Sequence, residues 1–325
     1  MKLPRRTFVH LAAGAAAVPA LSRVASAQAY PSRTARIVVG FPAGGATDIM
    51  ARLMSEFLTQ RLGQQFIVEN KPGASGNIGT EVVAKAPADG YTLLQVVTPH
   101  AINPALFTNL SFDFIRDFAP VIYLARLAYV VVVHPSVPAN TLPELIAYAK
   151  ANPGKINYGS AGAGTPQNIT VELFKMMSGV NLVHVPYRGG APAVVDLLAG
   201  QVQLIFAPVS EAIQHIKAGK LRALAVTPAA RLDVFPDLPT VGSVLPGYEA
   251  SGFAGISVPK GTPAAIIDLL NKELNAALAD PRIRGRIIEL GGTPVGGTPQ
   301  EFATIVSEAT EKWARVIKTA NIKVE

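Results

Sequence analysis

The residues whose types and spacing suit ligand chemistry gather in four short loops. Each loop combines glycine with proline or small polar residues between an expected strand and an expected helix; the loops are 41–48 (FPAGGATD), 71–77 (KPGASGN), 160–166 (SAGAGTP) and 186–192 (PYRGGAP). The first N–H groups of a helix lack intrahelical partners, and the helix dipole adds partial positive charge there. A carboxylate or phosphate therefore binds such a loop without a lysine or arginine. Together the loops predict an anion site, although each alone is also consistent with a simple turn.

A few side chains in or near these loops are candidates for specific contacts. Arg188 is placed to pair with a carboxylate through two hydrogen bonds, with Tyr187 beside it as a wall and donor, unless it simply faces solvent. Lys71 is a second, weaker cation. Asp48 is expected to stabilise the start of its helix, to order the first loop or to bind a ligand amino group. His100 is expected in a loop after a strand at 91–97, as a minor pocket candidate.

Motifs of several other functions are missing from the sequence. Residues 40–45 have the glycine spacing of a P-loop, but Ala46-Thr47 follow where Lys-Ser/Thr is required. Residues 162–167 do not complete G-x-G-x-x-G, and no serine occupies a G-x-S-x-G elbow. The chain has no cysteine and no histidine pair at metal-ligand spacing. With no evident nucleophile–base pair or paired carboxylates either, we expect no catalytic residue, no metal and no cofactor.

The first 29 residues have the form of an export signal. Basic residues precede a short apolar stretch at 11–21, and two small-x-small cleavage sites follow at 25–27 and 27–29. The pair Arg5-Arg6 before Thr7-Phe8-Val9 resembles a twin-arginine signal. No cysteine follows to carry a lipid, and no stretch is long and apolar enough to span a bilayer. We therefore expect a periplasmic protein that is soluble after cleavage and not inserted in the membrane.

The net charge does not favour nucleic acid as a partner. The chain carries a formal charge of +7, and four basic residues (Lys2, Arg5, Arg6 and Arg23) precede residue 30, which leaves the mature chain near +3. Nucleic-acid-binding domains are more basic, with their charge gathered on one face. The remaining charges are scattered, which is typical of a solvated surface.

Short β-rich runs alternate with helical patterns along most of the chain. Strands are expected at 36–40, 66–69, 91–97, 130–134, 156–160, 182–185, 202–206 and 221–226; helices at 47–62, 75–86, 142–151, 166–178, 192–199, 210–218, 263–278, 281–290 and 299–319. Consecutive β-α units predict an α/β protein with a mostly parallel sheet in each of two lobes. Residues 30–126 and 228–325 would form lobe 1, and 127–227 lobe 2. A cleft between two lobes is a usual ligand site.

Several segments in order along the chain resemble one known family. They read IVVGFPAGGATDIMAR, VENKPGASGNIG, APADGYTLL, INYGSAGAGT, VPYRGGAPAVVDLLAGQVQLIF, IKAGKLRALAV, LPTVGS and VPKGTP. In these segments the sequence resembles the periplasmic solute-binding proteins of tripartite tricarboxylate transporters, the Bug (Bordetella uptake gene) or TctC-like receptors. The resemblance implies a two-lobed, type II periplasmic-binding-protein fold. It also implies ligands such as di- and tricarboxylates, amino-acid-like acids or aromatic acids.

The resemblance also implies which residues contact the ligand. Those in the matching loops are Phe41, Ala43, Gly44, Gly45, Thr47, Asp48, Ser160, Gly164, Thr165, Tyr187, Arg188 and Gly189, with Ser75, Thr98, His100, Asn168 and Pro208 as weaker candidates. Asn168 stands where relatives often have histidine. Ala207 stands where relatives often have aspartate, so the hypothesis is that Ala207 lines the cleft and favours an aromatic or apolar acid.

The function predicted by these features is solute capture without chemistry. The receptor would close its cleft on a small carboxylate-bearing solute and deliver it, as a monomer, to the membrane subunits of a tripartite tricarboxylate-type transporter. The alternative is a ligand sensor that signals to a membrane sensor kinase. A more remote alternative is an exported hydrolase or lyase, which would need catalytic groups that the sequence does not reveal.

Overall fold

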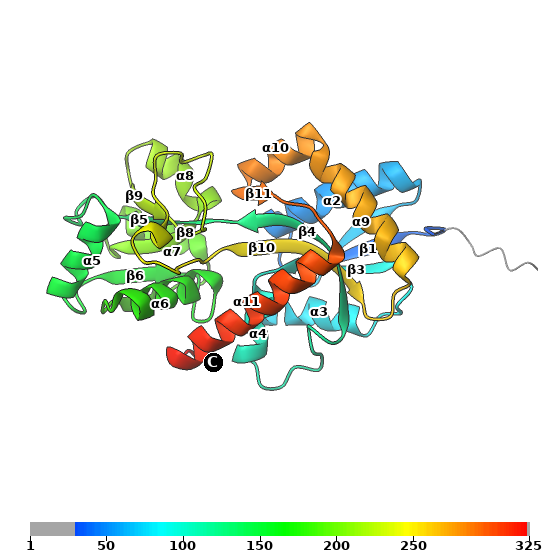
Figure 1. Ribbon diagram of the computed structural model, residues 1–325, viewed down its shortest axis with the longest axis horizontal. Coiled ribbons are helices and arrows are strands. Elements are labelled where there is room, and N and C mark those ends of the chain that lie inside the picture. Colours follow the sequence, from blue (N-terminus) through cyan, green and yellow to red (C-terminus); the bar gives the residue numbers. More distant parts are fainter. Residues whose placement is uncertain (1–29, 324–325) are drawn as a thin grey trace, which may run out of the picture. The chain divides into compact units, whose positions relative to one another are not determined.

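The structure, a computed structural model, describes residues 30–323, and its elements are labelled in Figure 1. The export signal predicted at residues 1–29 lies outside these described residues. Two β-sheets flanked by helices make up an α/β fold, as the sequence predicts. Within residues 30–323, none of the helices has the length and apolar character that crossing a membrane requires.

The first sheet has six strands in the order β11-β4-β10-β3-β1-β2. Its strands are β1 (Ala35–Val39), β2 (Phe66–Asn70), β3 (Thr92–Val97), β4 (Phe118–Leu127), β10 (Gly252–Pro259) and β11 (Gly292–Pro294). The helices packed with it are α2 (Ala46–Leu62), α3 (Asn77–Ala84) after the short η1 (Ala74–Gly76), α4 (Pro99–Leu106), α9 (Ala264–Ala279), α10 (Pro281–Glu289) and α11 (Pro299–Thr319). Both ends of the described chain therefore contribute to this sheet and its helices.

The second sheet has five strands in the order β7-β6-β8-β5-β9. Its strands are β5 (Tyr129–Val133), β6 (Asn157–Ser160), β7 (Val183–Pro186), β8 (Leu204–Pro208) and β9 (Arg222–Val226). Its helices are α5 (Leu142–Ala151), α6 (Pro166–Ser178), α7 (Gly190–Leu198) and α8 (Val209–Lys217), and the short η2 (Val241–Ser243) follows β9. Every residue of β5 is buried, which explains its uninterrupted run of β-branched valines.

The sheets were expected to be mostly parallel. Most strands of each sheet do run in one direction, but not all neighbouring strands pair in parallel. Strands β6, β7, β8 and β9 all run the same way, as β-α repeats require. However, β5 enters from β4 through Ala128 alone and inserts between β8 and β9, antiparallel to both. In the same way β10 inserts between β3 and β4, antiparallel to both. Both sheets are therefore mixed.

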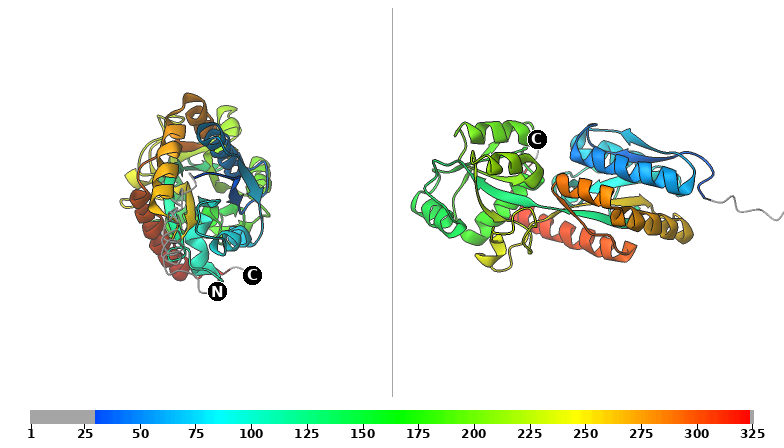
Figure 2. Two further views of the ribbon diagram at one scale, coloured as in Figure 1. Left: turned by 90° about the vertical axis from the view of Figure 1, so that its right-hand side faces the viewer. Right: turned by 90° about the horizontal axis from the view of Figure 1, so that it is seen from above.

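Two segments carry the chain between the sheets, and they are joined to each other (Figures 1 and 2). The first runs from β4 into β5, and the second runs from β9 through 227–251 into β10. The buried Thr227 links them, because its N–H donates to the Tyr129 carbonyl at 3.0 Å and its hydroxyl donates to the Ala250 carbonyl at 2.7 Å. The sheets are thus connected by a hydrogen-bonded pair of segments and not by one loose linker.

One helix near the expected site is absent from the sequence prediction. Residues Pro99–Leu106 form α4, where we expected a loop. The helix begins with proline at its first position, which is favourable, but Pro104 inside it removes an N–H and hides the helical pattern. His100 therefore sits on a helix, and its placement in a loop is wrong.

Candidate functional site

A pocket of ≈ 260 Å³ lies where loops from both sheets meet, and we call it the loop pocket. Its lining residues are Phe41, Ser75, Pro99, Asn103, Tyr129, Ala161, Gly164, Thr165, Pro166, Gln167, Gly190, Pro208 and Glu211. They come from all four glycine loops or the helices that follow them, and from α4, β5 and the β8–α8 junction. The prediction that loops distant in sequence share one ligand-sized space is consistent with this arrangement.

The first loop is held by the side chain of Asp48. Its carboxylate accepts hydrogen bonds from the Gly44 N–H at 2.9 Å, from Arg52 Nε at 2.8 Å and from Asn70 Nδ2 at 2.9 Å. Asn70 also donates to the carbonyl of Phe41, which lines the pocket. Burial raises the pKa of Asp48, but the hydrogen bonds from Arg52, Gly44 and Asn70 outweigh it and lower the pKa. Asp48 therefore orders the loop, which is one of the roles predicted for it.

The third loop is held in the same manner by Asn168. Its Oδ1 accepts from the Gly164 N–H at 2.9 Å, and its Nδ2 donates to the Tyr158 hydroxyl at 2.7 Å. Gly164, like Gly44, has a positive φ (71° and 84°), which glycine adopts without strain. Asn168 and Asp48 are each the third residue of their helix. The N–H groups of both glycines are thus committed to the loops and are not free donors for a ligand.

The second and fourth loops contribute less than predicted. Lys71 forms an ion pair with Glu69 at 2.8 Å. Arg188 is exposed and does not line the loop pocket, so its solvent-facing alternative describes the structure. The Tyr187 hydroxyl turns away to donate to Asp196 at 2.7 Å. From these loops the pocket instead receives Ser75 and Gly190.

The start of α7 supplies the anion-binding feature that the loops predict. Gly190, its first residue, lines the pocket, and its N-cap residue Gly189 carries no side chain to occupy the first N–H groups. Those N–H groups and the helix dipole favour an anion. A Cβ at position 190 would meet the carboxylate of Glu211, which would have to shift to accommodate it.

Glu211 is the principal residue that the sequence analysis missed. It is the third residue of α8, faces the pocket and accepts a hydrogen bond from Gln167 Nε2 at 3.3 Å. The surrounding protein raises the pKa of Glu211 by desolvation, which the hydrogen bond from Gln167 partly offsets. Gln167 Oε1 in turn accepts from the Ala161 N–H at 2.8 Å. Gln167 thus connects the third loop to the acid.

The hypothesis that Ala207 makes the cleft wall apolar is wrong. Ala207 is fully buried in the core of the five-stranded sheet and does not line the pocket. The strand alternates its side chains between the two faces of the sheet, and the pocket receives Pro208 and then Glu211 instead. The wall at this position therefore carries a carboxyl group.

A serine–histidine pair lies close to the pocket, although the sequence showed none. Ser160 Oγ is 2.6 Å from His184 Nε2, because β6 and β7 are neighbouring parallel strands. Ser160 is fully buried, and its hydroxyl also bonds the backbone N–H and carbonyl of Gly162 at 3.1 Å each. Burial lowers the pKa of His184. These contacts fix the third loop, and the hydroxyl does not face the loop pocket.

Two further weak candidates belong to the core. His100 is 3% exposed, packs against Phe114 with ring centroids 5.1 Å apart, and places Nδ1 2.8 Å from the Val97 carbonyl. Burial lowers the pKa of His100 to about 4. The Thr98 hydroxyl accepts from the Phe253 N–H at 2.9 Å. Neither side chain lines the loop pocket.

The predicted and observed site residues overlap in part. Predicted residues that line the pocket are Phe41, Ser75, Gly164, Thr165 and Pro208. Predicted residues that lie outside its lining are Ala43, Gly44, Gly45, Thr47, Asp48, Thr98, His100, Ser160, Asn168, Tyr187, Arg188, Gly189 and Ala207. Lining residues that were not predicted are Pro99, Asn103, Tyr129, Ala161, Pro166, Gln167, Gly190 and Glu211. In residues 30–323 there is no group of three or more acidic, histidine or cysteine side chains that could hold a metal ion.

Comparison with known proteins identifies the family and the fold class of the chain. Residues 50–322 match the family described as "Tripartite tricarboxylate transporter family receptor". Rpa4515 of R. palustris, solved with adipate, is 37% identical with a TM-score of 0.79 over 90% of this chain and 99% of that chain. The periplasmic binding protein BugD is 35% identical with a TM-score of 0.76 over 91% and 100%. MatC (Rpa3494) from Rhodopseudomonas palustris, solved with bound malate, is 31% identical with a TM-score of 0.75 over 89% and 100%.

The fold is thus that of a two-lobed periplasmic binding protein. Within that class, the chain belongs to the tripartite tricarboxylate transporter receptor family, the TctC and Bug proteins, which are solute-binding receptors.

Proposed function

We propose that this receptor binds a small organic acid in the loop pocket and delivers it to the membrane subunits of a tripartite tricarboxylate-type transporter. The observation that carries the proposal is the uncapped start of α7 at Gly190, inside a pocket that loops from both sheets line. A carboxylate at this position gains the free N–H groups and the helix dipole. The adipate and malate in two relatives are acids of this class.

The ligand also meets a carboxyl group, because the side chain of Glu211 lies against Gly190 at the start of α7. Glu211 and Gln167 occupy the same wall, and Tyr129 adds a phenol ring. A ligand group that meets an ionised carboxylate is favoured if it donates a hydrogen bond and disfavoured if it is a second carboxylate. We therefore propose an acid that carries a hydroxyl or amino group toward Glu211, in place of the aromatic or apolar acid inferred from Ala207.

The capture step is proposed to be closure of two lobes, residues 30–126 with 228–325 and residues 127–227. The membership of the two sheets supports this division, since β5 to β9 all fall between residues 129 and 226. Closure would bring Phe41 and Ser75 toward the third loop and exclude water from the carboxylate. Export by the segment 1–29 would place the receptor in the periplasm, where the transporter subunits are reached.

A thermal-shift screen tests the ligand class. A ligand at a hundred times its Kd adds about 2.7 kcal/mol to the free energy of unfolding, which raises the Tm by several degrees at this chain length. The panel contains malate, succinate, adipate, citrate, glutamate and benzoate, each paired with its uncharged amide as a matched control. The proposal predicts that at least one acid raises the Tm and that its amide does not. If refolded protein responds to none of the acids, or equally to acid and amide, the proposed ligand class is wrong.

A further inference from the structure

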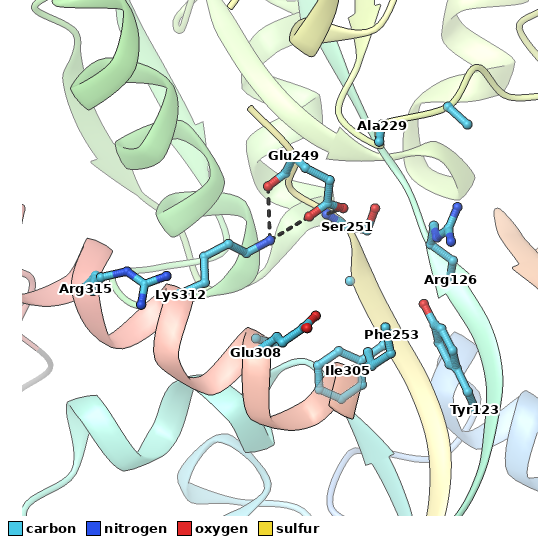
Figure 3. Close-up of a pocket in the computed structure, with 13 residues that line it drawn as sticks. Tyr123, Arg126, Ala229, Glu249, Ser251, Phe253, Ile305, Glu308, Lys312 and Arg315 are labelled. Atoms are coloured by element: carbon cyan, nitrogen blue, oxygen red, sulfur yellow. Dashed lines mark hydrogen bonds and ion pairs between the residues drawn. The ribbon is translucent and has the colours of Figure 1, made fainter. Parts of the chain in front are cut away.

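A second cavity, of ≈ 520 Å³, lies against α11, and we call it the α11 pocket (Figure 3). Its walls come from β4, the first residues of β10 with the segment before them, residues 229–230, and one face of α11. It shares none of its lining residues with the loop pocket. Its size falls within the range of small-molecule sites.

In the described structure, the α11 pocket is lined by a buried hydroxyl without a hydrogen-bond partner and by an arginine without an acidic partner. The Ser251 hydroxyl is buried and has no hydrogen-bond partner within the described part of the chain. Arg126 is half-buried, and its guanidinium forms no ion pair with any acid among residues 30–323. Buried polar groups in proteins are nearly always satisfied, so the Ser251 hydroxyl points to a partner from outside the chain. Arg126, which interacts with the Tyr123 hydroxyl, adds a positive charge that no acid of the described residues neutralises.

Tyr123 lies beside Arg126 and points its hydroxyl toward it in Figure 3. Burial raises the pKa of Tyr123 to about 12, while the charge of Arg126 lowers it in part. The phenol therefore stays protonated at neutral pH and can donate a hydrogen bond. One cation and two hydroxyl groups thus face the same part of the pocket.

The other charges of the α11 pocket are already paired or lie at its rim. Lys312 Nζ contacts a Glu249 carboxylate oxygen at 2.6 Å and donates to the Glu249 carbonyl at 3.1 Å. Glu308 and Arg315 are exposed on α11. The side chains of Ile305 and Ala309, on the same helix, add an apolar surface to the lining. The uncompensated charge of the lining is therefore positive, and the lining also has an apolar part.

We propose that the α11 pocket is a second binding site, for a small organic anion with an apolar body. The carboxylate or sulfonate of the ligand would pair with Arg126 and accept hydrogen bonds from Ser251 and Tyr123, while its body packs on Ile305 and Ala309. The site does not depend on the function proposed for the loop pocket. It does lie next to that pocket, since Gly252 of its lining stands close to Tyr129 of the other.

The test measures binding of 4-fluorophenylacetate by isothermal titration and by ¹⁹F NMR. The full chain carries Ala161→Trp throughout, which fills the loop pocket and leaves only the α11 pocket open. In that background, Arg126→Gln removes the proposed anion contact and Ala309→Trp fills the α11 pocket from the helix. Arg284→Gln, an exposed arginine on α10 outside both pockets, removes the same charge and serves as the matched control.

The proposal predicts one equivalent of bound probe in the Ala161→Trp protein. Arg126→Gln should weaken binding at least about tenfold, as expected for one charge-assisted hydrogen bond. Ala309→Trp should abolish binding, and Arg284→Gln should leave the Kd unchanged. Cooperative thermal unfolding of each variant shows that it is folded. Absence of probe binding to the Ala161→Trp protein overturns the proposal, as does equal binding by the folded Arg126→Gln and Ala309→Trp proteins.

Discussion

At the scale of single residues, one device shapes both of the loops that begin α2 and α6. In each, the third residue of the helix accepts a hydrogen bond from the N–H of a glycine with positive φ, from Gly44 to Asp48 and from Gly164 to Asn168. The side chain thereby satisfies a donor that would otherwise be unpaired at the start of the helix. The loops are fixed before a ligand arrives, so less ordering free energy is lost on binding.

Replacing Asp48 tests this device. Asp48→Ala leaves the Gly44 N–H and Asn70 without their acceptor, and we expect a loss of about 1–3 kcal/mol in the free energy of unfolding. Urea denaturation measures it, and Asp48→Asn, which retains an acceptor, should lose less. Unchanged stability in both variants would contradict the role assigned to Asp48.

The stabilising effect of Asp48 should also depend on pH. The folded-state pKa of Asp48 is lowered, so its contribution is present above the unfolded value of about 4 and is lost as the pH falls through the folded value. The difference in stability between the wild type and Asp48→Asn is therefore expected to shrink below about pH 4. A difference that stays constant from pH 7 to pH 3 would show that the charge of Asp48 contributes nothing.

In the proposed pose, Glu211 determines which ligand substituents the pocket accepts. Malate and succinate differ only by a hydroxyl group, which in malate can donate to the Glu211 carboxylate. We expect the wild type to bind malate more tightly than succinate. In Glu211→Gln the ratio of the succinate Kd to the malate Kd should fall about tenfold, as for the loss of one hydrogen bond to a charged group. Calorimetric Kd values for both acids give the ratio. An unchanged ratio would mean that the hydroxyl does not meet Glu211.

At the scale of elements, the start of β10 is tightly enclosed. A Cβ at Gly252 would lie 2.8 Å from Thr98 Oγ1 and 3.2 Å from both Leu127 Cβ and the Tyr129 hydroxyl. Thr98 has little freedom to move, because its hydroxyl accepts from the Phe253 N–H. The glycine is therefore required by the close approach of β10 to β4 and α4.

Gly252→Ala is expected to destabilise the protein by about 1–3 kcal/mol, as for other overpacked buried sites. The matched control is Gly285→Ala in α10, where nothing lies within 4 Å and alanine should be neutral or stabilising by about 0.5–1 kcal/mol. Thermal unfolding compares the two. Equal stability of both variants would show that the crossing segment adjusts freely.

Local signals in the sequence predicted many of these elements well. Thr165 with Pro166 marks the start of α6 and Gly179 its end, as the structure has them. The helix predicted at 299–319 likewise has the bounds of α11, which begins at Pro299 after the capping Thr298. Such signals are local, since a cap needs only neighbouring residues. They do not specify strand order, so the insertion of β5 between β8 and β9 could not be deduced from β-α alternation.

The candidate site was less predictable, because local sequence signals do not specify how distant segments come together. The glycine loops were recognisable, but the side chains that face the pocket depend on strand register and on where each helix begins. Because β8 extends to Pro208 and α8 follows at once, Glu211 reaches the pocket and Ala207 does not. Likewise, α4 brings Asn103 to the pocket, where its amide donates to the Ser75 carbonyl at 3.0 Å.

At the scale of the whole molecule, the two hydrogen-bonded crossing segments would form the axis of the proposed closure. The chain contains no cysteine, so pairs of cysteines can be introduced for labelling. Ile67 on β2 and Val195 on α7 are exposed and belong to different sheets. With spin labels at Ile67→Cys and Val195→Cys, a saturating ligand is expected to change and narrow the distance distribution. An identical distribution with and without ligand would contradict capture by closure.

The central claim is that the loop pocket binds a small organic acid. Titration calorimetry of the acid that gives the largest thermal shift tests it most directly, in the wild type, in Ala161→Trp and in Ala309→Trp. Both substitutions place an indole at a half-buried alanine, one in the loop pocket and the other in the α11 pocket. The account predicts one high-affinity site that Ala161→Trp abolishes and Ala309→Trp retains. Unchanged affinity in folded Ala161→Trp protein would contradict it.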